Sequence, residues 1–188
     1  MKTAHALSDD YAGSATSDRA PLSKLRLLLY TGESRYWFVK GEDPAVINLG
    51  LSYLDAAIAF VKKEFSKVSV AQKAVSFVGK EGEVPVAVVN QTGYPLKVDL
   101  VLKGIGLSFR GGSRHSATLG TGENIYRFPV TSTAANAVLR VQVVAGDTEV
   151  AHGDVKVRSL TVRSLIPWVL GGLLIIGGGL GLVLRLRT

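Results

Sequence analysis

The sequence predicts a mainly β protein, in which an antiparallel β-sandwich follows two α-helices and precedes one C-terminal transmembrane helix. Three observations predict this order. Hydrophobic residues recur at helical spacing up to Phe65, alternate in part at two-residue spacing from Val68 onward, and run without a charge from Leu165 to Leu184. The expected divisions are a disordered tail (1–21), a helical hairpin or appendage (22–67), the sandwich (68–160), the span (165–184) and a short basic tail (185–188).

The first 21 residues are expected to be disordered. Small polar and charged side chains dominate this stretch, and it lacks the apolar segment of a secretory signal peptide. A first helix is expected from near Leu22 to Phe38, and the tetrad Thr31-Gly32-Glu33-Ser34 is a point at which it can break into two pieces. The side chains that lie partly on one face of this helix are Leu22, Leu25, Leu29 and Tyr36.

The second helix has the clearest local signals. Asp43 is a good N-cap, and Pro44 occupies the first helical position, where its missing N–H group leaves no helical hydrogen bond unmade. An apolar stripe then recurs at spacings of three and four residues: Ile47, Leu51, Leu54, Ile58, Val61 and Phe65. Two interpretations remain open. The stripe packs against the first helix or the sandwich, or it is a docking face for another domain or partner.

From Val68 onward the hydrophobic period indicates β-strands. The cleanest half-buried strand is segment 96–103, in which leucine and valine occupy one side and Lys97, Asp99 and Lys103 occupy the other. Turns are expected at 81–83, 90–93 and 145–148, and a glycine- and serine-rich loop at 111–122. The expected strands are 68–78, 84–90, 96–103, 104–109, 124–130, 137–144 and 149–158.

Seven or so short strands, with turn signals about every ten residues and no helix between them, are typical of an immunoglobulin-like sandwich. The chain contains no cysteine, so the Cys…Trp…Cys signature of antibody domains is absent. Asn90 heads a glycosylation sequon, Asn90-Gln91-Thr92, but it also ends a strand before a turn. A structural role in the turn is the favoured interpretation, because asparagine tolerates turn geometry.

The stretch from Leu165 to Leu184 predicts a single transmembrane anchor. Its 20 residues carry no charge. At about 1.5 Å per residue, a helix of this length covers roughly 30 Å, the thickness of the hydrocarbon core of a bilayer. Trp168, beside Pro167, lies near one end of the span, where an indole ring sits at headgroup level, and Arg185 and Arg187 end the span on the other side.

The charge of the chain favours a membrane over a nucleic acid as a partner. The formal net charge is +7, and the basic residues are spread along the chain rather than gathered in a stripe with aromatic residues. Lys156, Arg158 and Arg163 precede the span and favour attraction to anionic lipid. Within the span, Gly177 and Gly181 fit the small-xxx-small pattern of helix–helix contact, although glycine is common in transmembrane helices for other reasons.

No sequence motif for catalysis, a cofactor or a metal is present. The three histidines, His5, His115 and His152, have no partner at the spacing of a local metal site. The nucleophile elbow, the phosphate-binding loop and the His-Glu-x-x-His pattern are absent. The protein is therefore expected not to be an enzyme and to need no cofactor. The candidate partner contacts are Arg110, Arg114 and His115, in the region of the 111–122 loop.

Two segments resemble known proteins. Glu83-Val84-Pro85-Val86-Ala87-Val88-Val89-Asn90, followed by Tyr94-Pro95-Leu96-Lys97-Val98, resembles bacterial Ig-like modules of the type found beside glycosidase domains. The wider layout adds Glu33-Ser34-Arg35-Tyr36-Trp37 on a helix, a long second helix and a terminal span ending in arginines. This layout resembles the C-terminal part of an uncharacterised actinobacterial membrane-anchored family that is often encoded beside the lipid II flippase.

The second resemblance covers about residues 22–188. Members of that family are typically longer, with a signal peptide and a large extracytoplasmic domain ahead of this region. The family has no established catalytic residues. The resemblance implies an envelope setting and a link to cell-wall assembly.

The expected function is that of a membrane-tethered, non-catalytic interaction or scaffold module of the bacterial cell envelope, with the sandwich outside the plasma membrane. Its expected partners are the bilayer and a membrane or envelope protein. A glycan has little support, because Trp37 is the single tryptophan outside the span. Two alternatives remain open: a C-terminal remnant or accessory subunit of a larger extracytoplasmic, glycosidase-like enzyme, and a tail-anchored cytoplasmic adaptor.

Overall fold

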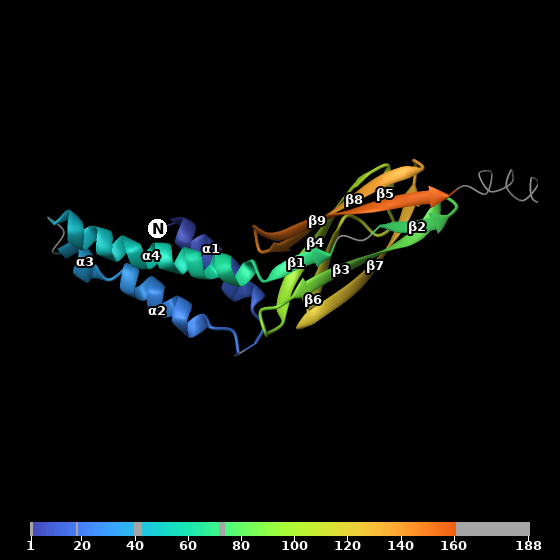
Figure 1. The fold of residues 1–188 in the computed structure, drawn as a ribbon. Helices are drawn as coiled ribbons and strands as arrows, with labels where there is room; N and C mark the ends of the chain where they lie inside the picture. The colour runs from blue at the N-terminus through green and yellow to red at the C-terminus, as the bar shows by residue number, and fades with distance from the viewer. Residues whose placement is uncertain (1, 18, 40–42, 72–73, 161–188) are drawn as a thin grey trace, which may run out of the picture.

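The computed structural model describes residues 2–17, 19–39, 43–71 and 74–160, and within them it contains a helical arm and a two-layer β-sandwich (Figure 1). Helices α1–α4 form the arm, and strands β1–β9 form the sandwich. The expectation of a mainly β protein with helices ahead of the strands is therefore confirmed. The expected span lies outside the described residues, together with its named positions Leu165, Pro167, Trp168, Gly177, Gly181, Leu184, Arg185 and Arg187.

Helix α1 (Lys2–Ser14) occupies residues that were expected to be disordered. That expectation is wrong because the helix is held by contacts with distant parts of the chain rather than by its own apolar stripe. Its buried residues recur at helical spacing, and Tyr11 is fully buried. The buried positions are Ala4, Ser8, Tyr11 and Ser14, of which two are serines, so hydrophobic periodicity alone does not mark them.

The first expected helix is divided in two, at the tetrad that the sequence indicated. Helix α2 spans Leu22–Gly32 and helix α3 spans Arg35–Val39. Gly32 lies against helix α4, where a Cβ atom added to it would be 2.6 Å from Leu54 Cδ2. A glycine at the end of α2 therefore lets the two helices approach more closely than any larger residue would.

Helix α4 (Pro44–Phe65) begins as the sequence predicts. The Asp43 side chain accepts a hydrogen bond from the backbone N–H of Ala45, at 2.8 Å, and Pro44 stands at the first position. The expected apolar stripe is buried toward the sandwich, at Leu54, Val61 and Phe65, and becomes exposed toward the N-terminal half of the helix.

In the described part of the chain, α4 is also the one helix that is long and apolar enough to cross a membrane, with a mean hydropathy of 1.5. Length and composition do not separate such a helix from a packed helix of a soluble protein. Two of its neighbours in the arm are α1 and α2 (Figure 1).

The sandwich consists of a four-stranded sheet in the order β1-β3-β7-β5 and a five-stranded sheet in the order β2-β9-β8-β4-β6. The first two strands lie in different sheets, since β1 pairs antiparallel with β3 whereas β2 pairs parallel with β9. The strands are β1 (Val68–Ala71), β2 (Val75–Val78), β3 (Glu81–Asn90), β4 (Leu96–Ile105), β5 (Leu107–Phe109), β6 (Arg114–Leu119), β7 (Gly122–Ser132), β8 (Asn136–Ala145) and β9 (Thr148–Leu160).

The core lies between the two sheets, and alternation along each strand supplies it. In β3 the inward residues are valines, and in β4 they are leucine and valine, as the two-residue period predicts. The largest fully buried side chains of the strands are Leu96, Leu100, Leu102, Leu119, Leu139, Val84, Val86, Val88, Val130 and Val141.

Two expected connections are wrong. Segment 81–83 is not a turn but the start of β3, and the chain reverses at Gly79, whose φ of 94° is available to glycine without strain. The 111–122 loop contains strand β6, which pairs with β4. In both places polar and small residues suggested a turn, but edge positions of a sheet carry such residues as well.

Asn90 has the structural role that was favoured over glycosylation. Its side-chain amide donates to the carbonyl oxygens of Tyr94 (2.9 Å) and Leu119 (3.2 Å). Its side-chain oxygen accepts from the backbone N–H of Thr92, at 3.0 Å. The residue is buried, so its amide nitrogen is engaged inside the turn between β3 and β4.

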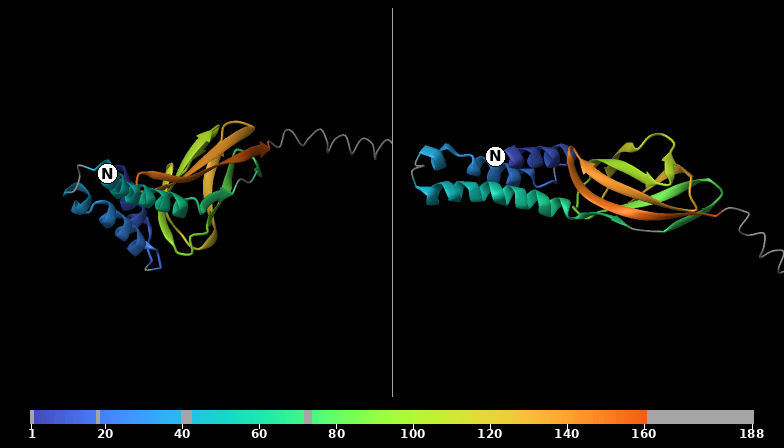
Figure 2. Two further views of the ribbon diagram at one scale, coloured as in Figure 1. Left: turned by 60° about the vertical axis from the view of Figure 1, so that its left-hand side comes forward. Right: turned by 90° about the horizontal axis from the view of Figure 1, so that it is seen from above.

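The arm and the end of strand β9 lie at opposite ends of the molecule (Figures 1 and 2). The β3–β4 and β8–β9 turns face the arm, and β9 runs away from it to Leu160. We call these ends the arm pole and the Leu160 pole. The described residues of the arm therefore precede the sandwich in sequence and lie at the end of the sandwich opposite Leu160.

Candidate functional site

The arm is joined to the sandwich by a buried cluster of polar and aromatic side chains, which we call the junction cluster: Tyr11, Phe60, Glu64, Phe65, Lys67 and Tyr94. The Tyr94 hydroxyl donates to Glu64 Oε2, at 2.6 Å, and is hydrogen-bonded to the Tyr11 hydroxyl. Lys67 Nζ donates to Glu64 Oε1, at 2.5 Å. The cluster thus links α1, the end of α4 and the β3–β4 turn in one connected network.

The aromatic part of the junction cluster surrounds Tyr11. Its ring meets that of Phe65 edge-on, with centroids 5.6 Å apart, and that of Phe60 edge-on, with centroids 6.2 Å apart. Edge-to-face pairs at these separations stabilise a packed interface beyond the area that they bury. Tyr11 therefore anchors α1 to α4 through its ring and to the sandwich through its hydroxyl.

Burial shifts the titration of both tyrosines. Loss of solvation raises the pKa of Tyr94 far above its usual value, and its hydrogen bond to the Glu64 carboxylate acts in the same direction. Loss of solvation also raises the pKa of Tyr11, while the hydrogen bond between Tyr11 and Tyr94 partly opposes that shift. Both hydroxyls are therefore neutral at physiological pH, and they serve as hydrogen-bonding groups rather than as bases.

A second contact between the arm and the sandwich is made by Asp10. One carboxylate oxygen accepts from Thr148 Oγ1, at 2.6 Å, and the other from the backbone N–H of Asp147, at 3.3 Å. The contact needs glycine at position 146, where φ is +57° and an added Cβ would lie 2.0 Å from Asp10 Oδ1. The β8–β9 turn is thus shaped to receive the carboxylate of α1.

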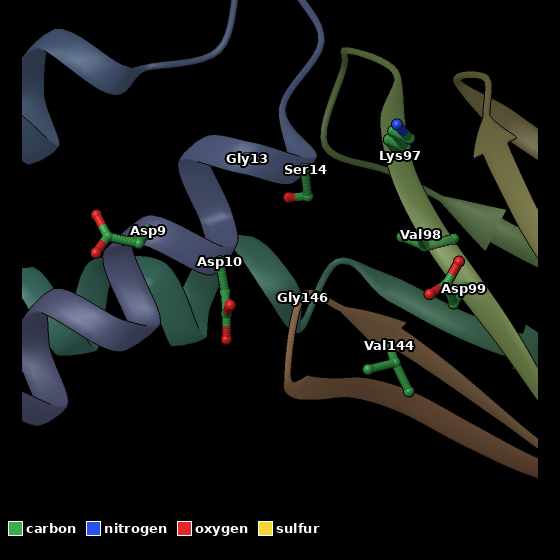
Figure 3. Close-up of a pocket in the computed structure, with 9 residues that line it drawn as sticks. All are labelled: Asp9, Asp10, Gly13, Ser14, Lys97, Val98, Asp99, Val144 and Gly146. Carbon is green, nitrogen blue, oxygen red and sulfur yellow. The ribbon is translucent and has the colours of Figure 1, made fainter.

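A shallow hollow of about 260 Å³ lies between α1 and the sandwich beside this contact (Figure 3). It is lined by carboxylates from both sides, Asp9 and Asp10 from α1 and Asp99 from β4, but these groups are not a ligand set. In Figure 3 the side chains of Asp9 and Asp10 point in different directions. Asp10 is engaged by the β8–β9 turn, and Asp99 by two donors described next.

Asp99 accepts from Ser116 Oγ at 2.6 Å and from Arg114 Nε at 2.8 Å. The Ser116 hydrogen bond, followed by that from Arg114, holds the pKa of the Asp99 carboxyl below its usual value. Across the described ranges, no group of three or more histidine, cysteine, aspartate or glutamate side chains could hold a metal ion. Of the three carboxylates that line the hollow, Asp10 and Asp99 are thus engaged by donors of the protein itself.

The structure places two of the predicted partner contacts, Arg114 and His115, in strand β6 rather than in a loop, and Arg110 in the turn before it. Arg110 follows β5 and forms an ion pair with Glu81. Arg114 opens β6 and pairs with Asp99, at 2.7 Å. The His115 ring lies against Phe128, with centroids 5.1 Å apart, and its Nε2 is 3.1 Å from the Gly112 carbonyl oxygen. Each side chain has an intramolecular partner, and their role in binding stays a prediction.

An apolar surface of the arm is exposed, and it includes Tyr30 and Tyr36, although the aromatic-rich segment 30–38 is expected from the sequence to be mostly buried. Among the described residues, five of the eight large hydrophobic side chains that remain exposed belong to α2, α3 and α4. They are Leu27, Tyr30, Tyr36, Leu49 and Leu51. Only Leu51 among them belongs to the apolar stripe of α4, for which docking to a partner was one of the two interpretations.

Packing of Trp37 inside the arm fixes the helices that carry these exposed side chains. The Trp37 ring lies on Gly50, where an added Cβ would be 2.7 Å from it, and stacks on Tyr53 with centroids 5.9 Å apart. Its indole N–H donates to the Thr31 carbonyl oxygen. Trp37 thereby holds α3 against α4, so the exposed apolar groups are borne on a fixed scaffold.

No protein-family model and no curated protein matches the chain. Similar solved structures each cover about half of it. WR4, an MSP family member of C. elegans, is 9% identical over 50% of this chain and 97% of its own, with a TM-score of 0.35. The PapD-like domain 7 of human CEP192 is 13% identical over 52% of this chain and 86% of its own, with a TM-score of 0.34.

A third similar structure, the YadV chaperone, is 10% identical over 51% of this chain and 52% of its own, with a TM-score of 0.35. At such scores these likenesses carry no argument about ligands or partners. The strand order itself shows that the protein has an immunoglobulin-like sandwich of two sheets, preceded by helices.

Proposed function

We propose that this chain is a membrane-tethered, non-catalytic immunoglobulin-like interaction module of the bacterial cell envelope. In this proposal the 165–184 span anchors the Leu160 pole, and the sandwich carries the arm away from the bilayer to meet a protein partner. One observation carries the proposal: the chain leaves the described structure at the pole opposite the arm, and the arm bears most of the exposed large apolar side chains.

The dimensions support a spacer role. Strand β9 has 13 residues, which at about 3.3 Å per residue span roughly 43 Å. Helix α4 has 22 residues and is about 33 Å long. Because the two elements follow one another along the length of the molecule (Figure 2), the far end of the arm lies tens of ångströms from Leu160.

The junction cluster supports a fixed rather than a swinging arm. Three hydrogen bonds join Tyr11, Tyr94, Glu64 and Lys67, and of these four side chains only that of Lys67 is partly exposed to water. Breaking such a network leaves buried polar groups without hydrogen-bond partners, which costs about 1–3 kcal/mol of stability for each group. A partner that binds the exposed apolar groups of the arm is therefore held at a defined distance and orientation from the anchor.

The kind of partner follows from the surface chemistry. Leucine and tyrosine dominate the exposed side chains of the arm, and aromatic and aliphatic anchors are what protein–protein contacts bury at their centre. The envelope setting and the link to cell-wall assembly rest on the resemblance to the actinobacterial family.

An accessory subunit of a larger glycosidase-like enzyme is the second candidate. The same apolar arm surface favours it, because a catalytic domain could cover these side chains. The tail-anchored cytoplasmic adaptor differs from both in topology. Protease added to intact spheroplasts would digest the sandwich in the envelope proposal and leave it protected in the adaptor.

Anchoring is tested with the full chain in native membranes. We expect it to remain with the membranes after alkaline washing, and to be released when Leu174 and Ile175 are both changed to arginine, since each charge near the middle of a span opposes insertion by about 2.5–3.5 kcal/mol. Exchange of Leu27 and Tyr30 for serine is the matched control and should leave anchoring intact. Wild-type protein in the supernatant would overturn the proposal.

Partner binding is tested with a photocrosslinking amino acid placed at Tyr30 or Leu49 in the arm, or at Ile125 on the sandwich as the control. All three positions are exposed. The proposal expects one discrete adduct from the arm positions, lost when Leu27 and Leu51 are both changed to aspartate, and none from position 125. Equal adducts from all three positions would contradict an arm-specific interface.

A further inference from the structure

The outer surfaces of the two sheets differ in charge at the Leu160 pole. On the five-stranded sheet, register places Lys103 beside Arg140 and Arg140 beside Asp154. The Arg140–Asp154 ion pair, at 2.8 Å, neutralises itself. Further basic side chains on this surface are Lys156 and Arg158. Lys103, Lys156 and Arg158 therefore remain as an excess of three positive charges.

Apolar side chains lie among these cations. Ile105 is opposite Val138, and Val138 is opposite Lys156, so the three form one row across β4, β8 and β9. Ile105 is 78% exposed, the highest value among the large hydrophobic residues described. Val78, at the end of β2, is 59% exposed and lies opposite Leu160 in register.

A hollow of about 410 Å³ follows the same surface, between β2, β9 and the start of β8. Its lining combines Val75 and Val138 with Lys156 and Arg158. We call this combination of outward-facing side chains the basic–apolar face, made up of the exposed Val78, Lys103, Ile105, Lys156 and Arg158 and the half-buried Val138.

Elsewhere on the sandwich this combination is not repeated. On the four-stranded sheet Glu81 pairs with Arg110 at the same pole, and Glu83 and Arg127 add one charge of each sign. On the five-stranded sheet toward the arm pole, Asp99, Asp147 and Glu149 outnumber Lys97 and Arg114. Among the described strand residues, the excess of positive charge thus lies in the part of the five-stranded sheet that adjoins Leu160, next to the turn that carries Lys80.

The length of chain beyond Leu160 decides what can reach this face. Four residues separate Leu160 from Leu165, so the two positions are at most roughly 18 Å apart. The headgroups occupy about 5–8 Å on each side of the hydrocarbon core. With the span in the bilayer, the distance from Leu160 to the headgroups is therefore comparable to a Debye length of about 8–10 Å.

We infer that the basic–apolar face rests on the surface of an anionic bilayer, with the sandwich tilted so that the end of its five-stranded sheet next to Leu160 faces the lipid and the arm still points away from it. Ile105, Val78 and Val138 enter the headgroup region, and Lys103, Lys156 and Arg158 lie at lipid phosphates. This inference rests on the proposed function, because the anchor brings the face to the membrane. It adds the orientation of the sandwich and the charge of the lipid.

The test uses the full chain in vesicles and exploits the absence of cysteine. A single cysteine is placed at Ile105 or, as the matched control, at Ile125, which is also an exposed strand isoleucine but lies on the four-stranded sheet. Each cysteine carries a fluorophore, and the vesicles contain a lipid with a quencher at headgroup depth. Vesicles of phosphatidylcholine alone are compared with vesicles containing about 30% phosphatidylglycerol.

The expected result is quenching at position 105 that exceeds quenching at position 125 by at least about threefold in the anionic vesicles, and that falls by about half or more in phosphatidylcholine or at about 1 M salt. Lys103→Glu with Lys156→Glu should remove the difference. Lys97→Glu with Arg127→Glu changes the net charge equally and should preserve it.

Each other outcome has a defined meaning. Equal quenching at positions 105 and 125 in a chain that floats with the vesicles would overturn this inference and leave the anchor in place. A blue-shifted emission at position 105 without lipid quenching would show that protein covers the face, and would overturn it too. A chain that does not float with vesicles would overturn both the inference and the proposed function.

Discussion

The two poles of this molecule differ in how their side chains are used. At the arm pole, Tyr11, Tyr94 and Glu64 are buried and hydrogen-bonded to one another. At the Leu160 pole, Val78 and Ile105 are exposed on the same surface as Lys103, Lys156 and Arg158. The difference indicates that one pole is an internal junction, which sets the shape of the protein, whereas the other presents apolar and basic side chains to the surroundings.

The largest contrast between the poles is expected from truncation to alanine. Tyr11→Ala removes a fully buried ring and the partner of the Tyr94 hydroxyl, so the free energy of unfolding should fall by about 3–5 kcal/mol. Ile105→Ala, at the exposed pole, should change it by no more than about 0.5 kcal/mol. Urea unfolding in detergent, followed by circular dichroism, measures both. Equal effects would remove the distinction between junction and surface.

Alkaline pH should weaken the junction. Because the folded-state pKa values of Tyr11 and Tyr94 are raised, the stability they confer is fully present below the unfolded value near pH 10. It is lost as pH rises above that value, by up to about 1.4 kcal/mol per pH unit for each tyrosine. Denaturant midpoints between about pH 9 and pH 11 test the slope, and a variant with phenylalanine at both positions should show a flatter profile.

Removal of one hydroxyl isolates the polar part of the junction. Tyr94→Phe removes the hydroxyl that donates to Glu64 Oε2 at 2.6 Å, while Lys67 still donates to Oε1, and should destabilise the fold by about 1–3 kcal/mol. The matched control is Tyr126→Phe, which removes a hydroxyl that donates to the Thr118 carbonyl oxygen at the surface, at 3.0 Å. That change should have an effect of about 0.5 kcal/mol. Indistinguishable midpoints would assign the junction to packing alone.

The smallest effect is expected at the second contact of the arm. Asp10→Ala removes the acceptor of Thr148 and Asp147 and should lower the free energy of unfolding by about 1 kcal/mol. Its neighbour Asp9 is exposed, and Asp9→Ala should be neutral within about 0.5 kcal/mol. Thermal unfolding of the two variants side by side gives the comparison. A larger loss from Asp9→Ala would contradict the described contact.

Local sequence signals predicted the helices and strands whose formation depends on interactions between residues close in sequence. Helix α4 begins at Asp43 and Pro44, whose effects are confined to the first helical turn, and the strand at Leu96 follows its own alternation. Helix α1 was missed for the opposite reason. Its anchor, Tyr11, is bonded to a residue 83 positions away, and no periodicity within residues 2–14 reveals that contact.

The candidate sites divide in the same way. Arg110 and Arg114 were predicted as partner contacts in a loop, but sheet register gives them Glu81 and Asp99 as neighbours. The basic–apolar face depends on register as well, since Ile105, Val138 and Lys156 are distant in sequence and adjacent across three strands. The sequence marks Lys156 and Arg158 as basic residues ahead of the expected span, but their apolar neighbours follow only from the pairing of the strands.

The most direct test of the account compares lipid contact at the two poles in one experiment. Fluorophores on single cysteines at Ile105 and at Leu49, which is exposed in α4, are exposed to the same headgroup quencher in vesicles that contain the full chain. Because we expect the Leu160 pole to contact the bilayer and the arm to point away from it, we predict strong quenching at position 105 and none at position 49. Quenching at position 49 equal to or greater than that at position 105 would place the arm in the bilayer and contradict the account.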